Sequence, residues 1–380
     1  MSNNSAGTRG LAGRDSMLTS AAAEAANTDK PYISVVMVTR NVEGFLSESI
    51  ESILGQTFQD FEFVIVDFGS RDNSQSIVLR YAAADSRIKF HVIPDCGLAE
   101  ARNESCFLAQ GRYIAIMDAD DVALPNRLLW EAEFLDTRRS VGVVGGAVEW
   151  INSVGKPLLI ARHPSENSEL QSALITHSVV WQPTALIRAE AFASVGHYRG
   201  AFAPAEDYDL WLRIAEHFEI ANLERVVLKY RIHPRQVSLQ KCTQQTLGIL
   251  GAQASASARR LGKPDPLDSV KELTPQMLVS LGVTEARQRA ALASNFRQWV
   301  EHMDRAGECA VALRGALEFL EFHSAHVDRQ QVAEVKLLVG KLWWRHKRFA
   351  KALLAVAQAI FTWPPLTRRL VEAASRRIGR

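Results

Sequence analysis

Three aspartates follow one short apolar run and could bind a cation. Residues 113–117 form the kind of β-prone run that makes a strand buried on both faces, and Asp118, Asp120 and Asp121 come directly after it. Carboxylates this close repel one another and raise each other's pKa unless a cation lies among them. Such oxygen-rich clusters suit Mg or Mn, particularly when a phosphate completes the coordination shell. The same residues could simply cap a turn before Pro125, so the motif alone leaves both interpretations open.

The pattern around this motif favours a shared binding site. Four strand-like runs alternate with segments whose apolar residues recur at helical spacing, which is typical of an α/β fold with a doubly wound parallel sheet. The runs are residues 32–38, 61–66, 88–93 and 113–117. Parallel strands end at the same edge of a sheet, so we expect Thr39, Asp67 and Asp118 to lie together there.

After residue 126 the order of the elements changes. Residues 141–144 and 147–151 predict two added strands, and residues 153–165, which are rich in glycine and proline, predict a loop near the site. Further strands are predicted at residues 184–187 and 226–230.

A second group of acids opens a predicted helix. Glu206 and Asp207 precede Leu210 and Trp211, which mark the buried side of that helix. Acidic residues at a helix start ordinarily stabilise the helix dipole by about 0.3 to 1 kcal/mol, and this role suits the pair as well as catalysis does. His233 follows the last predicted strand, where a polar loop residue and a metal ligand are both compatible with the pattern.

Length and composition indicate an ordinary globular protein. The 380 residues suffice for one large core and a smaller second unit, and 47% are hydrophobic and 23% charged. A net charge of +2 gives no indication of a nucleic-acid partner. The four cysteines form no CxxC pair and are interpreted as reduced cytosolic thiols. Residues 1–30 are rich in Ser, Ala, Asn and Gly, which predicts a disordered tail, and no uncharged apolar run reaches the roughly 18 residues of a membrane-spanning helix.

Two common phosphate-binding motifs are absent from the sequence. The chain has neither a P-loop nor a GxGxxG after its first strand, which weakens kinase, NTPase and dehydrogenase interpretations. A sugar nucleotidyltransferase would normally carry a Gly-rich, basic loop at that place, and residues 39–45 are not one.

Six segments together resemble a known family. They are TRN at 39–41, QTFQDFEFVIVDFGSRDNS at 56–74, GLAEARN at 97–103, GRYIAIMDADD at 111–121, PAEDYDLWLR at 204–213 and YRIHPRQVS at 230–238. In order and spacing, residues 32 to about 239 resemble the inverting glycosyltransferases of family 2. The resemblance implies the nucleotide-sugar-binding GT-A fold, a doubly wound mixed sheet, for a catalytic domain at residues 31–239.

The resemblance also implies roles on the donor side of the site. Thr39 and Asn41 would line the nucleotide pocket, and Asp67 would read the base, typically uracil or thymine. Arg102 would lie near the nucleotide, where a guanidinium can contact phosphate or base. The family usually has two acids where this chain has Asp67 and then Phe68, which leaves the base preference open.

Metal binding and catalysis are implied in the same way. Asp120 would be the principal ligand of a divalent Mn or Mg, Asp118 would approach the ribose and the metal, and His233 could reach the same cation. Asp207 would be the general base that takes the proton of the acceptor hydroxyl, with Glu206 in support. The cation would stabilise the leaving diphosphate as a Lewis acid.

The last third of the chain differs in composition. Residues 240–380 are rich in Ala and Leu at helical spacing and predict a helical extension. Residues 341–380 carry ten Lys or Arg against one acid, a local charge of +9, interleaved with Trp and Phe. Cationic helices with aromatic faces lie in membrane interfaces, so this end is expected either to attach to an anionic membrane surface or to be a solvated basic tail.

These observations predict a metal-dependent inverting glycosyltransferase. Its donor would be a UDP- or dTDP-sugar, and its acceptor a glycan or lipid-linked hydroxyl in bacterial surface polysaccharide or glycolipid synthesis. The expected location is cytoplasmic, with possible peripheral attachment to the inner face of the cytoplasmic membrane. A catalytically silent nucleotide-sugar-binding or scaffold protein is the alternative, followed by a nucleotidyltransferase; a glycosidase ranks last because it needs no metal cluster at a strand end.

Overall fold

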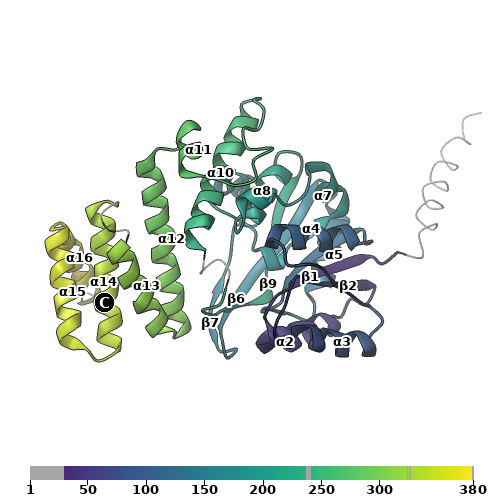
Figure 1. The fold of residues 1–380 in the computed structure, drawn as a ribbon, viewed down its shortest axis with the longest axis horizontal. Helices are drawn as coiled ribbons and strands as arrows, with labels where there is room; N and C mark the ends of the chain where they lie inside the picture. The colour runs from purple at the N-terminus through teal and green to yellow at the C-terminus, as the bar shows by residue number, and fades with distance from the viewer. Residues whose placement is uncertain (1–29, 237–240, 323, 325–326, 379–380) are drawn as a thin grey trace, which may run out of the picture.

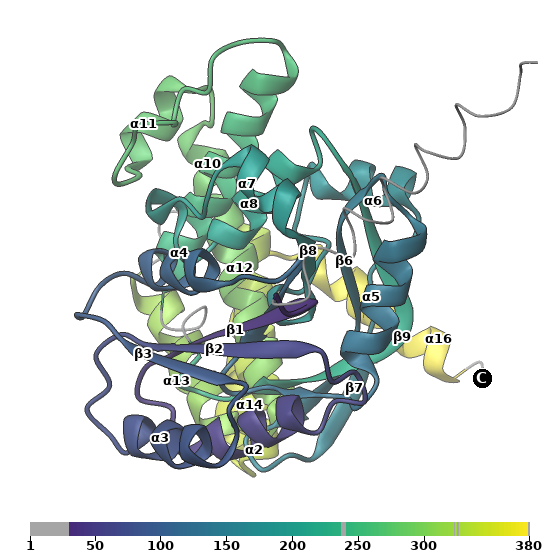
Figure 2. The same cartoon turned by 90° about the vertical axis from the view of Figure 1, so that its right-hand side faces the viewer.

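The computed structural model describes residues 30–236, 241–322, 324 and 327–378. The tail predicted for residues 1–30 lies, except for its last residue, outside the described residues, and so does the predicted domain boundary at 239–240. The described part contains a mixed sheet covered by helices on both faces, followed by a separate layer of C-terminal helices (Figures 1 and 2). The predicted fold class, a doubly wound mixed α/β sheet with a helical C-terminal extension, is confirmed.

Nine strands of the described chain form one sheet. They are β1 (Ile33–Thr39), β2 (Phe61–Asp67), β3 (Ile88–Val92), β4 (Tyr113–Asp118), β5 (Val122–Ala123), β6 (Val141–Asn152), β7 (Pro157–Ala161), β8 (Leu186–Arg188) and β9 (Glu219–Ile232). Their order is β3-β2-β1-β4-β8-β6-β9-β5, with β7 paired to β6. The first four are mutually parallel, whereas β8 runs antiparallel to both β4 and β6. The chain order reverses between β1 and β4, which is where such sheets bind ligands.

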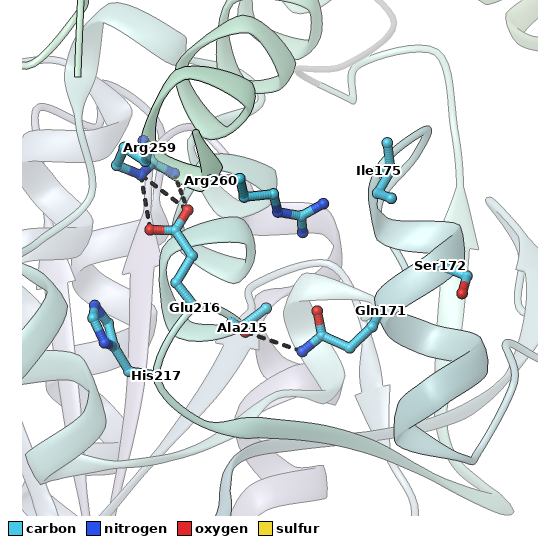
Figure 3. A pocket seen from close by; sticks show the side chains of 8 residues that line it. All are labelled: Gln171, Ser172, Ile175, Ala215, Glu216, His217, Arg259 and Arg260. Carbon is cyan, nitrogen blue, oxygen red and sulfur yellow. Dashed lines mark hydrogen bonds and ion pairs between the residues drawn. The ribbon is translucent and has the colours of Figure 1, made fainter. Parts of the chain in front are cut away.

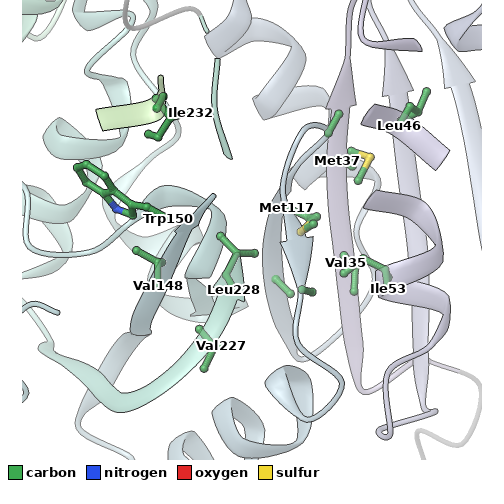
Figure 4. Close-up of a cluster of buried hydrophobic side chains, with 14 of the residues drawn as sticks. Val35, Met37, Leu46, Ile53, Met117, Val148, Trp150, Val227, Leu228 and Ile232 are labelled. Atoms are coloured by element: carbon green, nitrogen blue, oxygen red, sulfur yellow. The ribbon is translucent and has the colours of Figure 1, made fainter. Parts of the chain in front are cut away.

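Two hydrophobic clusters occupy the two faces of the sheet. Successive β1 side chains alternate between them, since Val35 and Met37 belong to one cluster and Val36 to the other. The first face is covered by α2 (Glu43–Leu54), α3 (Ser74–Ala84) and α5 (Arg127–Thr137). The second is covered by α4 (Leu98–Leu108), α6 (Asn167–Leu174), α7 (Ala189–Val195), α8 (Glu206–Ile214) and α10 (Cys242–Arg260). Figure 4 shows part of the first cluster, where Val35, Met37 and Met117 come from the parallel strands.

The structure corrects the predictions for residues 141–165. The two predicted strands are one continuous strand, β6, because Gly145 and Gly146 mark a crowded bulge rather than a break. A Cβ on Gly146 would lie 2.6 Å from the Val227 side chain of β9, so the bare backbone permits the close approach of the two strands. The predicted loop at residues 153–165 contains β7, which folds back on β6 through a turn at Gly155. There the Asn152 side chain accepts hydrogen bonds from two backbone amides of the turn.

The C-terminal helices pack on the sheet through this hairpin. They are α11 (Pro275–Ser280), α12 (Glu285–Ala306), α13 (Cys309–Phe322), α14 (Arg329–Arg345), α15 (Phe349–Thr362) and α16 (Leu366–Ile378). Asn152 donates a 3.5 Å hydrogen bond to the carbonyl of Ala306, and the rings of Trp150 and His302 lie 4.6 Å apart. The preceding helix α10 packs against α8, within the second cluster of the sheet, and also contacts α12. The division of the chain at residue 240 stays a prediction.

No single described helix is long and apolar enough to cross a membrane. Residues 349–362 and 366–372 meet the length and composition criterion only as a pair, across a bend of 119°.

Candidate active site

The carboxyl ends of three parallel strands bring predicted site residues together. Thr39 of β1 is directly opposite Asp67 of β2, and Asp118 of β4 is opposite Val38. The Thr39 hydroxyl donates a 3.1 Å hydrogen bond to Oδ2 of Asp67. The expectation that these residues share one edge of the sheet is therefore confirmed.

Asp67 organises the loop after its own strand. Its side chain is fully buried, and Oδ1 accepts hydrogen bonds from the amides of Gly69 and Ser70 and from the side chain of Gln75. Gly69 has a positive φ of 96°, which favours glycine at this turn. The carboxylate thus holds the turn in place, and the base-reading role stays a prediction.

Asn41 and Phe68 shape the outer rim of the same edge. Asn41, at φ 53°, donates its backbone amide to Ser70 and accepts a 2.8 Å hydrogen bond from the amide of Arg71, so it joins the loops after β1 and β2. Phe68 is only 6% exposed and lies beneath the guanidinium of Arg40, 5.5 Å from its ring centroid. An aromatic floor therefore stands where the family usually has its second acid.

Arg102 of α4 connects the strand end to the second acidic group. Its Nη2 donates a 3.1 Å hydrogen bond to Oδ1 of Asp118, and its Nη1 pairs with Oε1 of Glu206 at the start of α8. Arg102 thus lies between two carboxylates, and its predicted contact with the nucleotide stays a prediction. Among the described residues, Nε of Arg102 and Oε2 of Glu206 are buried without a hydrogen-bond partner.

Asp207 differs from Glu206 in environment. Glu206 is fully buried against Arg102, whereas Asp207 is partly exposed and accepts a 2.7 Å hydrogen bond from the amide of Tyr208. Burial raises the pKa of Asp207 to about 7; the charge of Glu206 adds to the rise and that of Arg102 opposes it. A carboxylate with a pKa near neutrality is suited to accept a proton under physiological conditions.

The loop after β4 carries the remaining acids. Oδ2 of Asp120 lies 2.9 Å from Nε2 of His233. Burial raises the pKa of Asp118, Arg102 lowers it and Asp120 raises it again, with a net upward shift. Burial and the charges of Asp120 and Asp118 raise the pKa of Asp121 well above its usual range. The three acids therefore share one region of mutual repulsion, with His233 in contact with Asp120.

Arg231 is a positioning residue that the sequence analysis missed. Its backbone amide donates to Oδ1 of Asp121 at 2.7 Å, and its Nε donates to the carbonyl of Asp120 at 2.7 Å. Its Nη2 pairs with Glu48 of α2 at 2.6 Å, which links the acidic loop to the helix after β1. The only sequence signal that could have identified Arg231 was its position two residues before His233.

The residues present fit a divalent cation, although they are not arranged as a finished metal site. Oxygen-rich donors suit Mg or Mn, and the mutual repulsion that raises the pKa of Asp118 and Asp121 is what a cation would relieve. Oδ2 of Asp121 is buried without a hydrogen-bond partner among the described residues. Among all the described residues, no three acidic, histidine or cysteine side chains lie close enough together to hold a metal ion. The structure brings Asp120 and His233 together, while Asp118 faces Arg102.

A surface cavity lies away from the strand ends. It measures about 580 Å³ and is lined by α6, the end of α8 and the end of α10 (Figure 3). The guanidinium of Arg259 in its wall is already paired with Glu216 at 2.7 Å. None of the predicted site residues lines this cavity, and it has no part in the site at the strand ends.

Comparisons with known proteins point to one family. A family model described as glycosyl transferase family 2 matches residues 34–196. An uncharacterised glycosyltransferase of Methanocaldococcus jannaschii is 33% identical over 225 residues, which cover 58% of this chain and 77% of that protein. The O-antigen biosynthesis glycosyltransferase WbnJ of Escherichia coli is 31% identical over 205 residues, covering 53% of this chain and 80% of WbnJ. Among solved structures, the mannosyltransferase PcManGT from Pyrobaculum calidifontis aligns with a TM-score of 0.49 and 16% identity, over 89% of this chain and 88% of that one.

Proposed function

Because this chain belongs to glycosyltransferase family 2, we propose that it moves a sugar from a nucleoside-diphosphate sugar to an acceptor hydroxyl, with inversion at the anomeric carbon. The observation that carries the proposal is the chain of contacts from Asp118 through Arg102 to Glu206, because it joins the strand ends to the helix that presents Asp207. A donor bound at the strand ends would have its anomeric carbon between those strand ends and Asp207. In this proposal Asp207 is the catalytic base, and Glu206 and Arg102 are positioning residues.

The nucleotide would bind at the rim formed by the loops after β1 and β2. Thr39, Asn41 and Asp67 fix the course of these two loops through their mutual hydrogen bonds. A UDP- or dTDP-sugar is the proposed donor. Phe68 is only 6% exposed beneath the guanidinium of Arg40, so it would support this rim by packing rather than by stacking on the base.

Asp120, Asp118 and His233 would hold a divalent Mn or Mg. When bound, such an ion supplies Lewis-acid stabilisation to the departing diphosphate. The protein's own contribution is to hold these groups ready: Arg231 fixes the backbone of Asp120 and the side chain of Asp121, and Arg102 orients Asp118. Asp207 accepts the proton of the acceptor hydroxyl as its oxygen forms the new bond to the anomeric carbon and the bond from that carbon to the nucleoside diphosphate breaks.

The acceptor proposed is a glycan or lipid-linked hydroxyl in bacterial surface polysaccharide or glycolipid synthesis. This is supported by the described role of one relative, the O-antigen biosynthesis glycosyltransferase WbnJ. A cytoplasmic location, at the inner face of the membrane, completes the proposal.

Nucleotide binding tests the donor half of the proposal directly. We expect calorimetry with a panel of nucleoside diphosphates and their sugars to detect Mn-dependent binding of one nucleotide. Asp120→Ala should weaken this binding by about tenfold to a hundredfold, because a main ligand of the ion is removed. Asp268→Ala, at an exposed aspartate outside the site, is the matched control and should bind as the wild type does. A folded wild type that binds no nucleotide in the panel would instead support the catalytically silent scaffold.

The pH dependence of transfer tests the assignment of the base. Asp207 must be ionised to accept a proton, and its pKa is raised to about 7. We therefore expect kcat/KM to rise with pH, tenfold per unit at low pH, and to level off above about 7. A profile that is flat between pH 5 and pH 8, roughly the range over which an unperturbed aspartate is already ionised, would contradict the assignment.

A further inference from the structure

Helix α15 turns its large apolar side chains outward. Its buried side chains are alanines: Ala352, Ala355 and Ala359. By contrast, Leu353, Leu354 and Phe361 are 65%, 59% and 89% exposed. Figure 1 shows α15 on the side of the helical region that faces away from the sheet. An ordinary surface helix buries its large apolar residues and exposes its polar ones, whereas α15 exposes large apolar residues beside its polar ones.

A neighbouring helix hairpin provides an internal comparison. Helices α12 and α13 form one hairpin, and α14 and α15 form a second whose turn comes forty positions later, with Gly307 and Lys347 both at positive φ. The positions of α15 that are equivalent to Arg314 and Glu321 of α13, forty residues later, hold Leu354 and Phe361. Arg314 and Glu321 are exposed, as polar residues should be. The outer hairpin of a stacked array normally has a polar outer face, so the apolar face of α15 indicates that something covers it.

The surroundings of this face are cationic. Lys347, Arg348 and Lys351 are exposed at the start of α15, and none of the three pairs with a carboxylate in the described part of the chain. At the same end Trp344 is 58% exposed and its ring lies 4.7 Å from that of Phe349. The Lys351 ammonium lies 4.6 Å from the ring centroid of Trp343, so cations and aromatic rings adjoin the apolar strip. This is the composition of a helix that lies in an anionic lipid surface.

We propose that α15 docks on an anionic membrane surface, with Leu353, Leu354 and Phe361 inserted among the acyl chains and Lys347, Arg348 and Lys351 at the headgroups. Two copies of the chain facing each other through this surface would bring the same cations together, whereas anionic lipid complements them. The inference does not depend on the transfer reaction. If the proposed function also holds, the docked helix would keep the active site close to a lipid-linked acceptor.

Co-sedimentation of the full chain with vesicles tests the proposal. We expect the wild type to bind vesicles of phosphatidylglycerol and phosphatidylcholine, to bind phosphatidylcholine alone much more weakly, and to be released by salt. Leu354→Glu combined with Phe361→Glu should lower the partition coefficient by about tenfold or more, because two inserted side chains become charged. The triple substitution Lys347→Gln, Arg348→Gln and Lys351→Gln should lower it by roughly a hundredfold on the anionic vesicles only.

A matched control separates this surface from a general effect of added charge. Leu317 of α13 and Val279 of α11 are 42% and 43% exposed, and Leu317→Glu combined with Val279→Glu makes the same charge change elsewhere. This variant should bind as the wild type does, and circular dichroism should show that every variant is folded. Equal binding by the α15 variants and the wild type would overturn the proposal. So would a wild type that ignores vesicles but forms a dimer that Leu354→Glu with Phe361→Glu dissociates, since that result would assign the face to a second copy.

Discussion

Replacing Asp207 by asparagine is expected to lower kcat by about a hundredfold to ten thousandfold, the usual contribution of a general base. The amide has the shape of the carboxylate and can still accept the hydrogen bond from the Tyr208 amide, but it cannot take the proton of the acceptor. Nucleotide affinity should change little, because Asp207 makes no contact with the loops after β1 and β2 among the described residues. Initial rates and calorimetry on the same preparations would give both quantities.

The stability of this variant provides an independent check. The pKa of Asp207 is raised from 3.8 to about 7, so the folded state binds a proton more tightly than the unfolded state. Ionised Asp207 therefore costs folding free energy, and this cost grows as the pH rises from about 4 towards 7. Asp207→Asn should be more stable than the wild type at pH 8 and similar to it at pH 3. A kcat within about threefold of the wild type, in a variant with this stability profile, would contradict the role of base and leave the burial of Asp207 intact.

The strand ends of the site were predictable because they depend on local pattern. Apolar runs that end in a polar residue identify the buried strands, and parallel strands place Thr39, Asp67 and Asp118 at one edge. The family resemblance, rather than periodicity, predicted that Asp120 and His233 could reach the same cation, and the structure shows these two side chains in contact across 113 positions. The fold class needed only the alternation of strands and helices.

The partners of the charged residues were not predictable in this way. Arg102 pairs with Glu206 across 104 positions of sequence, and Arg231 pairs with Glu48 across 183. Contacts over such separations depend on how the elements pack in the tertiary structure. The continuous strand β6 was missed for a related reason, since the glycines that look like a break in the sequence are required by the side chain of Val227 on a distant strand. The exposure of the large apolar residues of α15 was also not predictable, because periodicity shows that a helix has an apolar face but not which face is covered.

Substitution of Arg102 by methionine is expected to have the largest structural effect in the site. The guanidinium pairs with Glu206 and Asp118, and its loss leaves a fully buried carboxylate without its cation, which typically costs about 3 to 5 kcal/mol. Urea unfolding would measure this loss. Arg102→Lys should recover part of the stability, because one ammonium can serve only one of the two carboxylates well.

The same substitution should move the pH profile of transfer. Arg102 lowers the pKa of Asp207 and Glu206 raises it, so the two residues act on the base in opposite directions. We expect the acidic limb of kcat/KM to shift to higher pH in Arg102→Met and to lower pH in Glu206→Gln. A role for Arg102 in stability alone would reduce the amount of folded enzyme without moving either limb. Shifts of opposite sign would therefore identify Arg102 and Glu206 as the residues that set the proton affinity of Asp207, whereas shifts in the same direction would rule out this coupling.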